Sequence, residues 1–163
     1  MGAGKTSVGQ TLATSLGWRF VDLDARITAK TGRTIAQIFA QDGEPSFRNL
    51  EHTELRLLLD EPGPTVLSLG GGAWTQPANT ALLATLPVFF LDAPVEDLWQ
   101  RCLPEQATRP LLQSETAFRQ LYTARQTAYA TGTTRINTQA RTIEQVSTEI
   151  QLLLGLAPTP TST

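Results

Sequence analysis

The 163-residue sequence contains a single cysteine, Cys102, and a single histidine, His52. One cysteine cannot form a disulfide within the chain, and one cysteine with one histidine cannot supply the usual nitrogen and sulfur ligands of a zinc site. Any bound metal is therefore expected to be a hard cation held by oxygen atoms. We expect Cys102 to lie in the core of a helix and His52 on a helix surface.

The sequence also lacks a long apolar run, an excess of positive charge and a basic N-terminal segment followed by an apolar stretch. These absences argue against a membrane span, against the broad basic face of a nucleic-acid-binding protein, and against export. With 40% hydrophobic and 17% charged residues, the chain is too apolar to be disordered. We expect one soluble α/β or α+β domain located in the cytoplasm.

Lysine is scarce too, since the chain has eleven arginines but only Lys5 and Lys30. Lys5 lies in Gly2-Ala3-Gly4-Lys5-Thr6, which matches the last part of the phosphate-loop pattern G-x-x-x-x-G-K-[ST]. Apolar residues spaced by four then predict a helix that ends at Gly17. Glycines let backbone N–H groups point inward, and the positive end of the helix also attracts a polyphosphate. In this interpretation the Lys5 ammonium reaches the β- and γ-phosphates of a nucleotide, and the Thr6 hydroxyl binds Mg²⁺.

The same five residues could also be a flexible segment before a helix. A phosphate loop of this kind normally follows a buried strand, and the first glycine of the pattern would fall before Met1. We therefore expect either that the chain does not bind phosphate or that Met1 lies inside the loop. In the second case the first, central strand is missing, and the sheet has a gap beside which backbone groups are unpaired.

Strand and helix patterns alternate along the rest of the chain, with Asp24, Thr34, Ser114 and Thr142 as candidate helix caps. We expect strands at residues 18–23, 65–69, 88–91 and 135–137, and helices at residues 24–31, 34–39, 44–59, 77–86, 94–102, 114–130 and 142–153. This alternation predicts a three-layer α/β domain over residues 1–156, in which a parallel sheet has helices on both faces. Residues 103–113 are expected to form a lid, and residues 157–163 a disordered tail.

Polar residues and glycines follow the expected strands at their carboxyl ends, where parallel α/β proteins bind ligands. Asp22 and Asp24 lie at the end of one strand, and Gly70-Gly71-Gly72 follows the next. Lys5 and Thr6 would follow the strand that is missing. We therefore expect these residues to gather at one edge of the sheet.

Three arginines suggest that the ligand is an anion. Arg125 falls on the apolar face of its helix, where it either binds an anion, reaches solvent or pairs with a carboxylate of the protein. Arg48 lies between Glu44 and Glu51, either of which could be its partner. Arg109, beside a proline in the expected lid, could simply be solvated.

Taken together, these segments resemble the shikimate kinase family, in the nucleoside monophosphate kinase group of P-loop proteins. The resemblance runs from residue 2 to about residue 130 with the family's spacing, and the whole set is much more specific than any one segment. The matching segments are Gly2-Ala3-Gly4-Lys5-Thr6, Phe20-Val21-Asp22-Leu23-Asp24, Thr31-Gly32-Arg33-Thr34-Ile35, Gly43-Glu44 with Phe47-Arg48 and Glu51, Leu69-Gly70-Gly71-Gly72-Ala73, Arg109-Pro110-Leu111-Leu112, and Arg125 with Tyr129.

The resemblance implies a role for each matching residue, with Lys5, Asp24 and Arg109 as the catalytic residues. The ATP phosphates would be bound by Gly2, Ala3, Gly4, Lys5, Thr6, Ser7 and Arg109. Thr6 would ligate Mg²⁺, with Asp22 near the metal through water. Asp24 would hydrogen-bond the hydroxyls of shikimate and act as base for the attacking hydroxyl. Arg48 and Arg125 would clamp the shikimate carboxylate, while the backbone of Gly70, Gly71 and Gly72 approaches the substrate closely. Gln139 or Arg141 would contact adenine.

The implied reaction transfers the γ-phosphate of ATP to the 3-hydroxyl of shikimate, in the cytoplasmic route to chorismate and the aromatic amino acids. The resemblance also implies a monomer with no nucleic-acid or membrane partner. One alternative is another small-molecule kinase, acting on gluconate or a nucleotide. The Asp22-x-Asp24 pair, the triple glycine and two arginines suited to a carboxylate argue against it, because this combination has no evident use for a second nucleotide. Another alternative is a non-catalytic binding module of the same fold, in which an incomplete phosphate loop leaves shikimate binding intact and ATP binding weak.

Overall fold

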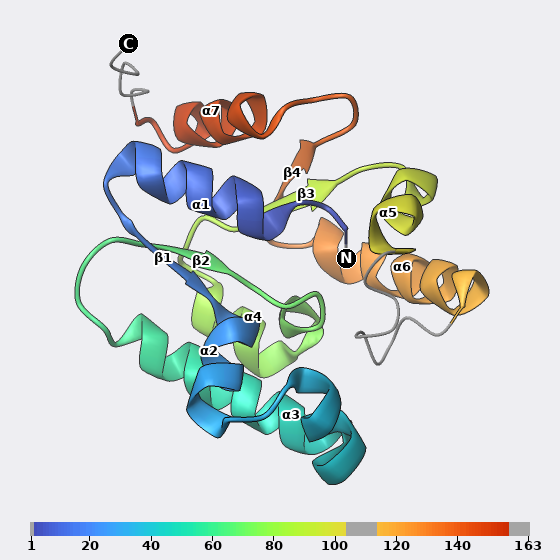
Figure 1. Cartoon of the computed structure of the whole chain (residues 1–163). Coiled ribbons are helices and arrows are strands. Elements are labelled where there is room, and N and C mark those ends of the chain that lie inside the picture. Colours follow the sequence, from blue (N-terminus) through green and yellow to red (C-terminus); the bar gives the residue numbers. More distant parts are fainter. Residues whose placement is uncertain (1, 104–113, 157–163) are drawn as a thin grey trace.

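The computed structural model describes residues 2–103 and 114–156, and Figure 1 shows how their helices and strands are arranged. The strands are β1 (Arg19–Asp22), β2 (Thr65–Ser68), β3 (Phe89–Asp92) and β4 (Thr134–Asn137). The helices are α1 (Lys5–Leu16), α2 (Leu23–Thr31), α3 (Ile35–Leu59), the 3₁₀ turn η1 (Ala73–Thr75), α4 (Pro77–Leu83), α5 (Val95–Cys102), α6 (Glu115–Ala130) and α7 (Ile143–Leu153). The predicted alternation of strands and helices is therefore confirmed. Most of the expected lid, including Arg109, and the expected tail lie outside the described residues.

The strands pair in parallel, as the alternation predicts. β1 pairs with β2, so that Val21 faces Leu67, and β3 pairs with β4, so that Leu91 faces Ile136. Among the described residues these are two separate two-stranded sheets. Figure 1 shows α1 and α7 side by side over one face of the strands and α3 with α4 on the other, which makes three layers.

Local capping signals set the beginnings of most helices. The side chains of Thr34, Ser114 and Thr142 accept hydrogen bonds from the first turns of α3, α6 and α7, as predicted. The prediction that Asp24 caps α2 is wrong, because the Asp22 side chain accepts from the Ala25 N–H at 3.2 Å. β1 passes directly into α2 with no loop between them, so the cap is the last residue of the strand, and Asp24 lies in the first turn of the helix.

Helix α3 contains a kink at Gly43, whose backbone adopts φ 79° and ψ 168°. A positive φ is easily reached only by glycine, and Pro45 follows where the second part of the helix begins. The two helices expected at residues 34–39 and 44–59 are therefore present, joined across this residue. The kink separates the part of α3 that carries Arg48 and Glu51 from the part that begins at Ile35.

The buried residues form two clusters, one on each side of the strands. The first packs α1 and α7 against β3, β4 and α5 and includes Cys102, which is 1% exposed, as predicted. The second packs α2, α3 and α4 against β1 and β2. The prediction for His52 needs correction, because the side chain is half-buried and its Nδ1 lies 2.8 Å from Asn79 Oδ1.

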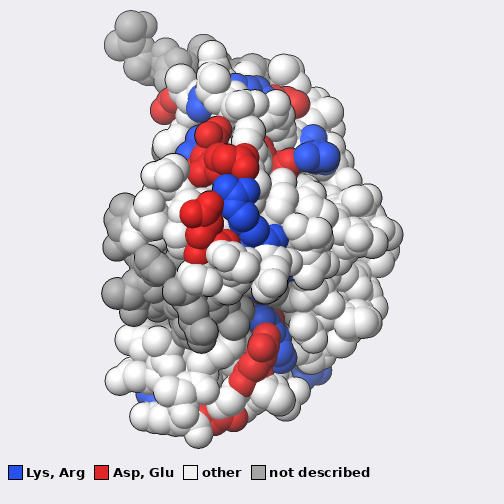
Figure 2. Space-filling model, turned by 90° about the vertical axis from the view of Figure 1, so that its right-hand side faces the viewer, with Lys and Arg blue, Asp and Glu red and all other residues white. Residues whose placement is uncertain are grey.

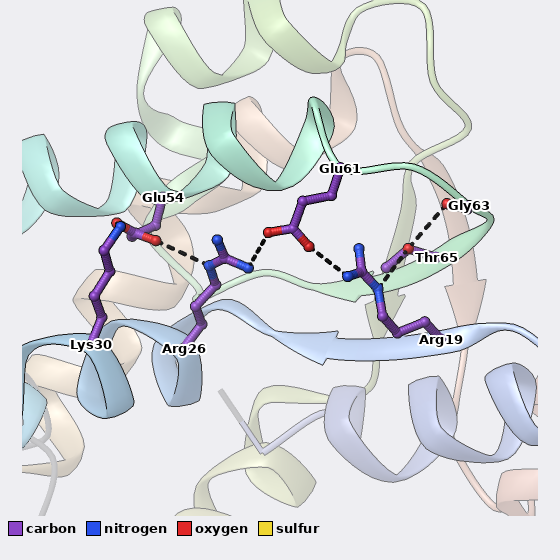
Figure 3. A network of polar contacts seen from close by, with 7 residues as sticks. All are labelled: Arg19, Arg26, Lys30, Glu54, Glu61, Gly63 and Thr65. Atoms are coloured by element: carbon purple, nitrogen blue, oxygen red, sulfur yellow. Dashed lines mark hydrogen bonds and ion pairs between the residues drawn. The ribbon is translucent and has the colours of Figure 1, made fainter.

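A chain of ion pairs fixes α2 and β1 against the end of α3 (Figure 3). Lys30 Nζ lies 2.6 Å from Glu54 Oε1, and Arg26 binds Glu54 at 3.0 Å and Glu61 at 2.6 Å. Arg19 then pairs with the second oxygen of Glu61 at 2.5 Å. Burial would raise the pKa of Glu54, but hydrogen bonds and charge from Lys30 and Arg26 outweigh it and hold that pKa below its usual value. The network therefore fixes the position of α2, which carries Asp24, relative to α3, which carries Glu51.

Candidate active site

Two glycines in the loop before α1 have a left-handed backbone. Gly2 and Gly4 have φ of 67° and 79°, values that suit glycine. A Cβ on Gly2 would lie 2.6 Å from the Leu98 carbonyl oxygen and 2.9 Å from Cys102 Sγ, so the loop packs tightly on α5. No side chain of the described residues caps the first turn of α1, and that turn carries no acidic residue. Its N–H groups and the positive end of its dipole are thus suited to an anion.

Thr6 and Asp22, which are far apart in the sequence, meet at the start of this helix. The Thr6 hydroxyl donates to Asp22 Oδ2 at 3.0 Å, and Lys5 is half-buried beside it in the chain. Among residues 2–103 and 114–156 no group of three or more histidine, cysteine, aspartate or glutamate side chains is placed to hold a metal. Mg²⁺ usually takes only one or two protein oxygens and completes its shell with water and phosphate oxygens. One hydroxyl and one carboxylate therefore fit Mg²⁺ bound together with a nucleotide.

The turn after β2 brings Gly70 against two carboxylates. A Cβ on Gly70 would lie 2.8 Å from Asp24 Oδ1 and 3.1 Å from Glu51 Oε1. Since Asp22 binds Thr6 and Asp24 follows two residues later, this turn is connected to the phosphate loop through the end of β1. The prediction that the ends of β1 and β2 meet at one place is confirmed by these contacts.

The next two glycines contact the two arginines that the sequence singled out. A Cβ on Gly71 would lie 3.0 Å from Arg125 Nη1, and one on Gly72 would lie 2.6 Å from Arg48 Cζ. Three consecutive glycines thus leave room for two carboxylates at Gly70, for the Arg125 guanidinium at Gly71 and for the Arg48 guanidinium at Gly72. The structure brings these predicted substrate residues together around a single turn.

Arg48 is held by both of its candidate partners. Its Nε and Nη2 donate to Glu44 Oε1 at 3.1 and 2.7 Å, and its Nη1 donates to Glu51 Oε2 at 2.9 Å. The guanidinium also lies 5.1 Å from the ring centroid of Phe47. Burial would lower the pKa of Arg48, but Glu51 and Glu44 raise it, so the group stays charged. Its position is fixed before any ligand arrives.

Glu51 is a residue of the site to which the sequence assigned only a possible pairing with Arg48. It is 0% exposed, and its Oε1 has no hydrogen-bond partner among the described residues. Burial raises the pKa of Glu51, Arg48 and Arg125 lower it, and the charge of Asp24 raises it further. Its spacing of three residues from Arg48 was a signal of the ion pair, but its burial involves the glycine turn, which is distant in the sequence.

Arg125 lies half-buried on α6, four residues before Tyr129, and both face Gly71. The Tyr129 hydroxyl donates to the Gly71 carbonyl. Burial raises the pKa of the Tyr129 phenol, although Arg125 and Arg48 act in the opposite direction. The phenol therefore remains a hydrogen-bond donor at neutral pH. Tyr129 matched the family in sequence but received no role from it.

The two candidate adenine residues lie in the turn after β4. Arg141 pairs with Glu149 and donates to the carbonyls of Asn137 and Gln145, both at 3.0 Å. The Gln139 N–H donates to Asn137 Oδ1 at 2.9 Å, while its side chain is exposed. The structure thus fixes the Arg141 guanidinium and leaves the Gln139 side chain at the surface.

The surface charges are mixed. Figure 2 shows acidic and basic side chains interleaved on one face of the molecule, with no continuous basic patch on that face. Within residues 2–103 and 114–156, none of the helices combines the length and the apolar character that a membrane crossing requires.

A parallel α/β fold in which a glycine loop with Lys5 and Thr6 opens a helix, beside a second site rich in arginine and carboxylate, defines a P-loop kinase. The sequence model of the shikimate kinase family matches residues 1–154. The chain belongs to the shikimate kinase family, whose members are phosphotransferases that pass the γ-phosphate of ATP to the 3-hydroxyl of shikimate.

Individual relatives agree with this assignment. The shikimate kinase of Cereibacter sphaeroides is 40% identical over 162 residues, which are 97% of this chain and 80% of that protein. The shikimate kinase of Geobacter sulfurreducens is 43% identical over 154 residues, or 92% of this chain and 84% of that protein. The solved structure of shikimate kinase from Acinetobacter baumannii in complex with shikimate superimposes with a TM-score of 0.85 at 37% identity, over 95% of this chain and 89% of that one.

Proposed function

We propose that the backbone of Gly2 to Ser7, including Ala3 and Gly4, binds the phosphates of ATP together with the Lys5 ammonium. The positive φ of the two glycines and the uncapped first turn of α1 support this assignment. Thr6 would ligate Mg²⁺, and Asp22 would hold a water of the metal. A metal held by these residues would neutralise charge on the phosphate oxygens.

Shikimate would bind over the turn of Gly70, Gly71 and Gly72. The observation that carries this proposal is that a Cβ on any of the three glycines would crowd a charged group of the site. Arg48 and Arg125 would form the clamp for the substrate carboxylate, because planar guanidinium groups match a carboxylate with paired hydrogen bonds. The buried Glu51 Oε1 beside Asp24 would accept from a substrate hydroxyl.

Asp24 is the proposed base. As its carboxylate takes the proton of the 3-hydroxyl, the hydroxyl oxygen attacks the γ-phosphorus, and the bond from phosphorus to the β–γ bridging oxygen breaks. ADP leaves with the electron pair of that bond, and Lys5 stabilises the charge that develops on the phosphates. Arg109, which lies outside the described residues, is proposed to fold over these phosphates and exclude water.

The remaining assignments concern the adenine contact, the oligomeric state, the cellular location and the partners. We assign the adenine contact to Arg141, whose three internal bonds favour stacking on a planar base, with Gln139 as the alternative. We further propose a monomeric, cytoplasmic enzyme with no nucleic-acid or membrane partner. The net charge of −2 supports the lack of a nucleic-acid partner.

Calorimetric titration tests the binding assignments directly. The wild-type chain should bind both MgATP and shikimate, and Arg125→Lys should weaken shikimate binding by about 10- to 100-fold, the loss expected for one charge-assisted hydrogen bond. Arg119→Lys on the same helix is the control, because Arg119 pairs with Glu96 and Glu115 away from the turn. Unchanged shikimate affinity in Arg125→Lys would contradict the clamp. Shikimate binding without MgATP binding in the wild type would favour a non-catalytic module.

A further inference from the structure

Tyr129 joins α6 to the glycine turn beside Arg125, one of the two proposed clamp arginines. Its hydroxyl donates to the Gly71 carbonyl, and it lies 3.6 Å from the Cβ that Gly71 lacks, while Arg125 Nη1 lies 3.0 Å from that position. The ring packs on Phe90 of β3, with centroids 4.6 Å apart. The hydroxyl is thus held between a strand, a helix and the turn, and none of the proposed catalytic steps uses it.

A second set of hydrogen bonds joins the glycine-turn region to the end of α6, and here the donor lies on the turn side. The indole N–H of Trp74, which follows the glycine turn in η1, donates to the carbonyls of Ala128 and Thr131 at 3.0 and 3.2 Å. Trp74 is buried, and a Cβ on Gly132 would lie 3.2 Å from its ring. The end of α6 and the turn therefore exchange hydrogen bonds, with Tyr129 donating one way and Trp74 the other.

These bonds set the geometry of the clamp. Arg48 belongs to α3 and contacts Gly72, whereas Arg125 belongs to α6 and contacts Gly71. The distance between the two guanidinium groups therefore depends on how the turn sits against α6. A carboxylate held by two arginines tolerates little change in that distance, because the strength of each hydrogen bond falls steeply with misalignment.

We propose that Tyr129 is a positioning residue for the shikimate carboxylate, which holds the glycine turn so that Arg48 and Arg125 face the substrate together. Trp74 holds the same turn against α6 through its hydrogen bonds to the carbonyls of Ala128 and Thr131. The inference rests on the proposed clamp and adds a group that touches neither the substrate nor the reacting atoms. Tyr129 acts through the Gly71 carbonyl and, beside it, through Arg125.

The test is Tyr129→Phe, which keeps the ring on Phe90 and removes only the hydroxyl. The KM for shikimate should rise roughly fivefold, the factor that corresponds to a lost hydrogen bond of about 1 kcal/mol, while the KM for ATP and the thermal midpoint change little. Tyr122→Phe is the matched control on the same helix, since the Tyr122 hydroxyl lies 3.4 Å from Asp92 Oδ1 instead of at the turn. It should leave both KM values unchanged.

Two further measurements separate positioning from a general loss of structure. In an Arg125→Lys background, Tyr129→Phe should add less than about twofold to the KM for shikimate, because residues that act through each other are not additive. Trp74→Phe should raise the same KM in the same direction. An unchanged KM in Tyr129→Phe, an equal rise in the KM for ATP, or full additivity with Arg125→Lys would each overturn the inference. All of these measurements require shikimate-dependent activity in the wild type, whose absence would instead contradict the proposed function.

Discussion

Replacing Gly72 by alanine should weaken shikimate binding for a purely steric reason. The backbone of Gly72 has φ −100° and ψ −14°, which alanine adopts without strain. The added Cβ, however, would lie 2.6 Å from Arg48 Cζ. Because carbon atoms in contact are normally about 3.5 to 4.0 Å apart, the guanidinium or the turn must move by about 1 Å.

The structure indicates how costly that movement is. Arg48 is held by Glu44 and Glu51 through three hydrogen bonds, so it cannot retreat without breaking some of them. A misplacement of about 1 Å in a group that positions substrate can cost about 100-fold, so we expect the KM for shikimate to rise by about 10- to 100-fold. The KM for ATP should change by less than about twofold, since the variant leaves the phosphate loop untouched.

Steady-state kinetics by coupled ADP release, with each substrate varied in turn, measures both constants. Gly9→Ala is the control for crowding, because its Cβ would also lie 2.6 Å from a neighbour, here Phe20 Cε2. That variant should lower the thermal midpoint, as overpacked cores do, without raising the KM for shikimate. A normal KM for shikimate in Gly72→Ala, or equal rises in both KM values, would refute the assignment of Arg48 to the substrate.

Three further experiments test other residues. Asp24→Asn should lower kcat by about 10²- to 10⁴-fold in the same assay, and a kcat within twofold of wild type would exclude Asp24 as the base. Thr6→Val should raise the Mg²⁺ concentration needed for half-maximal activity by about 10- to 100-fold, with Thr6→Ser as the control, and an unchanged Mg²⁺ titration would remove Thr6 from the metal site. The difference in the free energy of unfolding between wild type and variant, measured in urea, should depend on pH in opposite directions for Glu51→Gln and Glu54→Gln. The raised pKa of Glu51 means that the wild type loses stability relative to Glu51→Gln as pH rises from the ordinary glutamate value through the raised one. The lowered pKa of Glu54 means that the wild type is more stable than Glu54→Gln above the ordinary value and loses that advantage as pH falls through the lowered one. Parallel pH profiles for the two variants would contradict both shifts.

Much of the fold could be predicted because its signals are local. Thr34, Ser114 and Thr142 cap helices through hydrogen bonds that span three residues, and such pairs are visible in a sequence. The error at Asp24 has a similar local origin. Asp24 was the predicted cap, but β1 passes directly into α2, so Asp22 two residues earlier takes that position.

The composition of the site could be predicted only in part. The sequence makes the three glycines, Arg48 and Arg125 conspicuous as residue types. The side chain that a Cβ on each glycine would crowd, however, is set by the packing of α2, α3 and α6 around the turn. The complete burial of Glu51 depends on that packing as well. The contacts of Tyr129 and Trp74 could not be predicted, because the carbonyls that they bind lie more than fifty positions away in the sequence.

The most direct test of this account is the release of ADP from MgATP with and without shikimate, with the product analysed by phosphorus NMR. We predict that rapid release requires shikimate and that the product is a phosphate ester at the 3-hydroxyl of the substrate. ADP release that is absent, or that proceeds at the same rate without shikimate, would contradict the assignment of a shikimate site to the glycine turn and its two arginines.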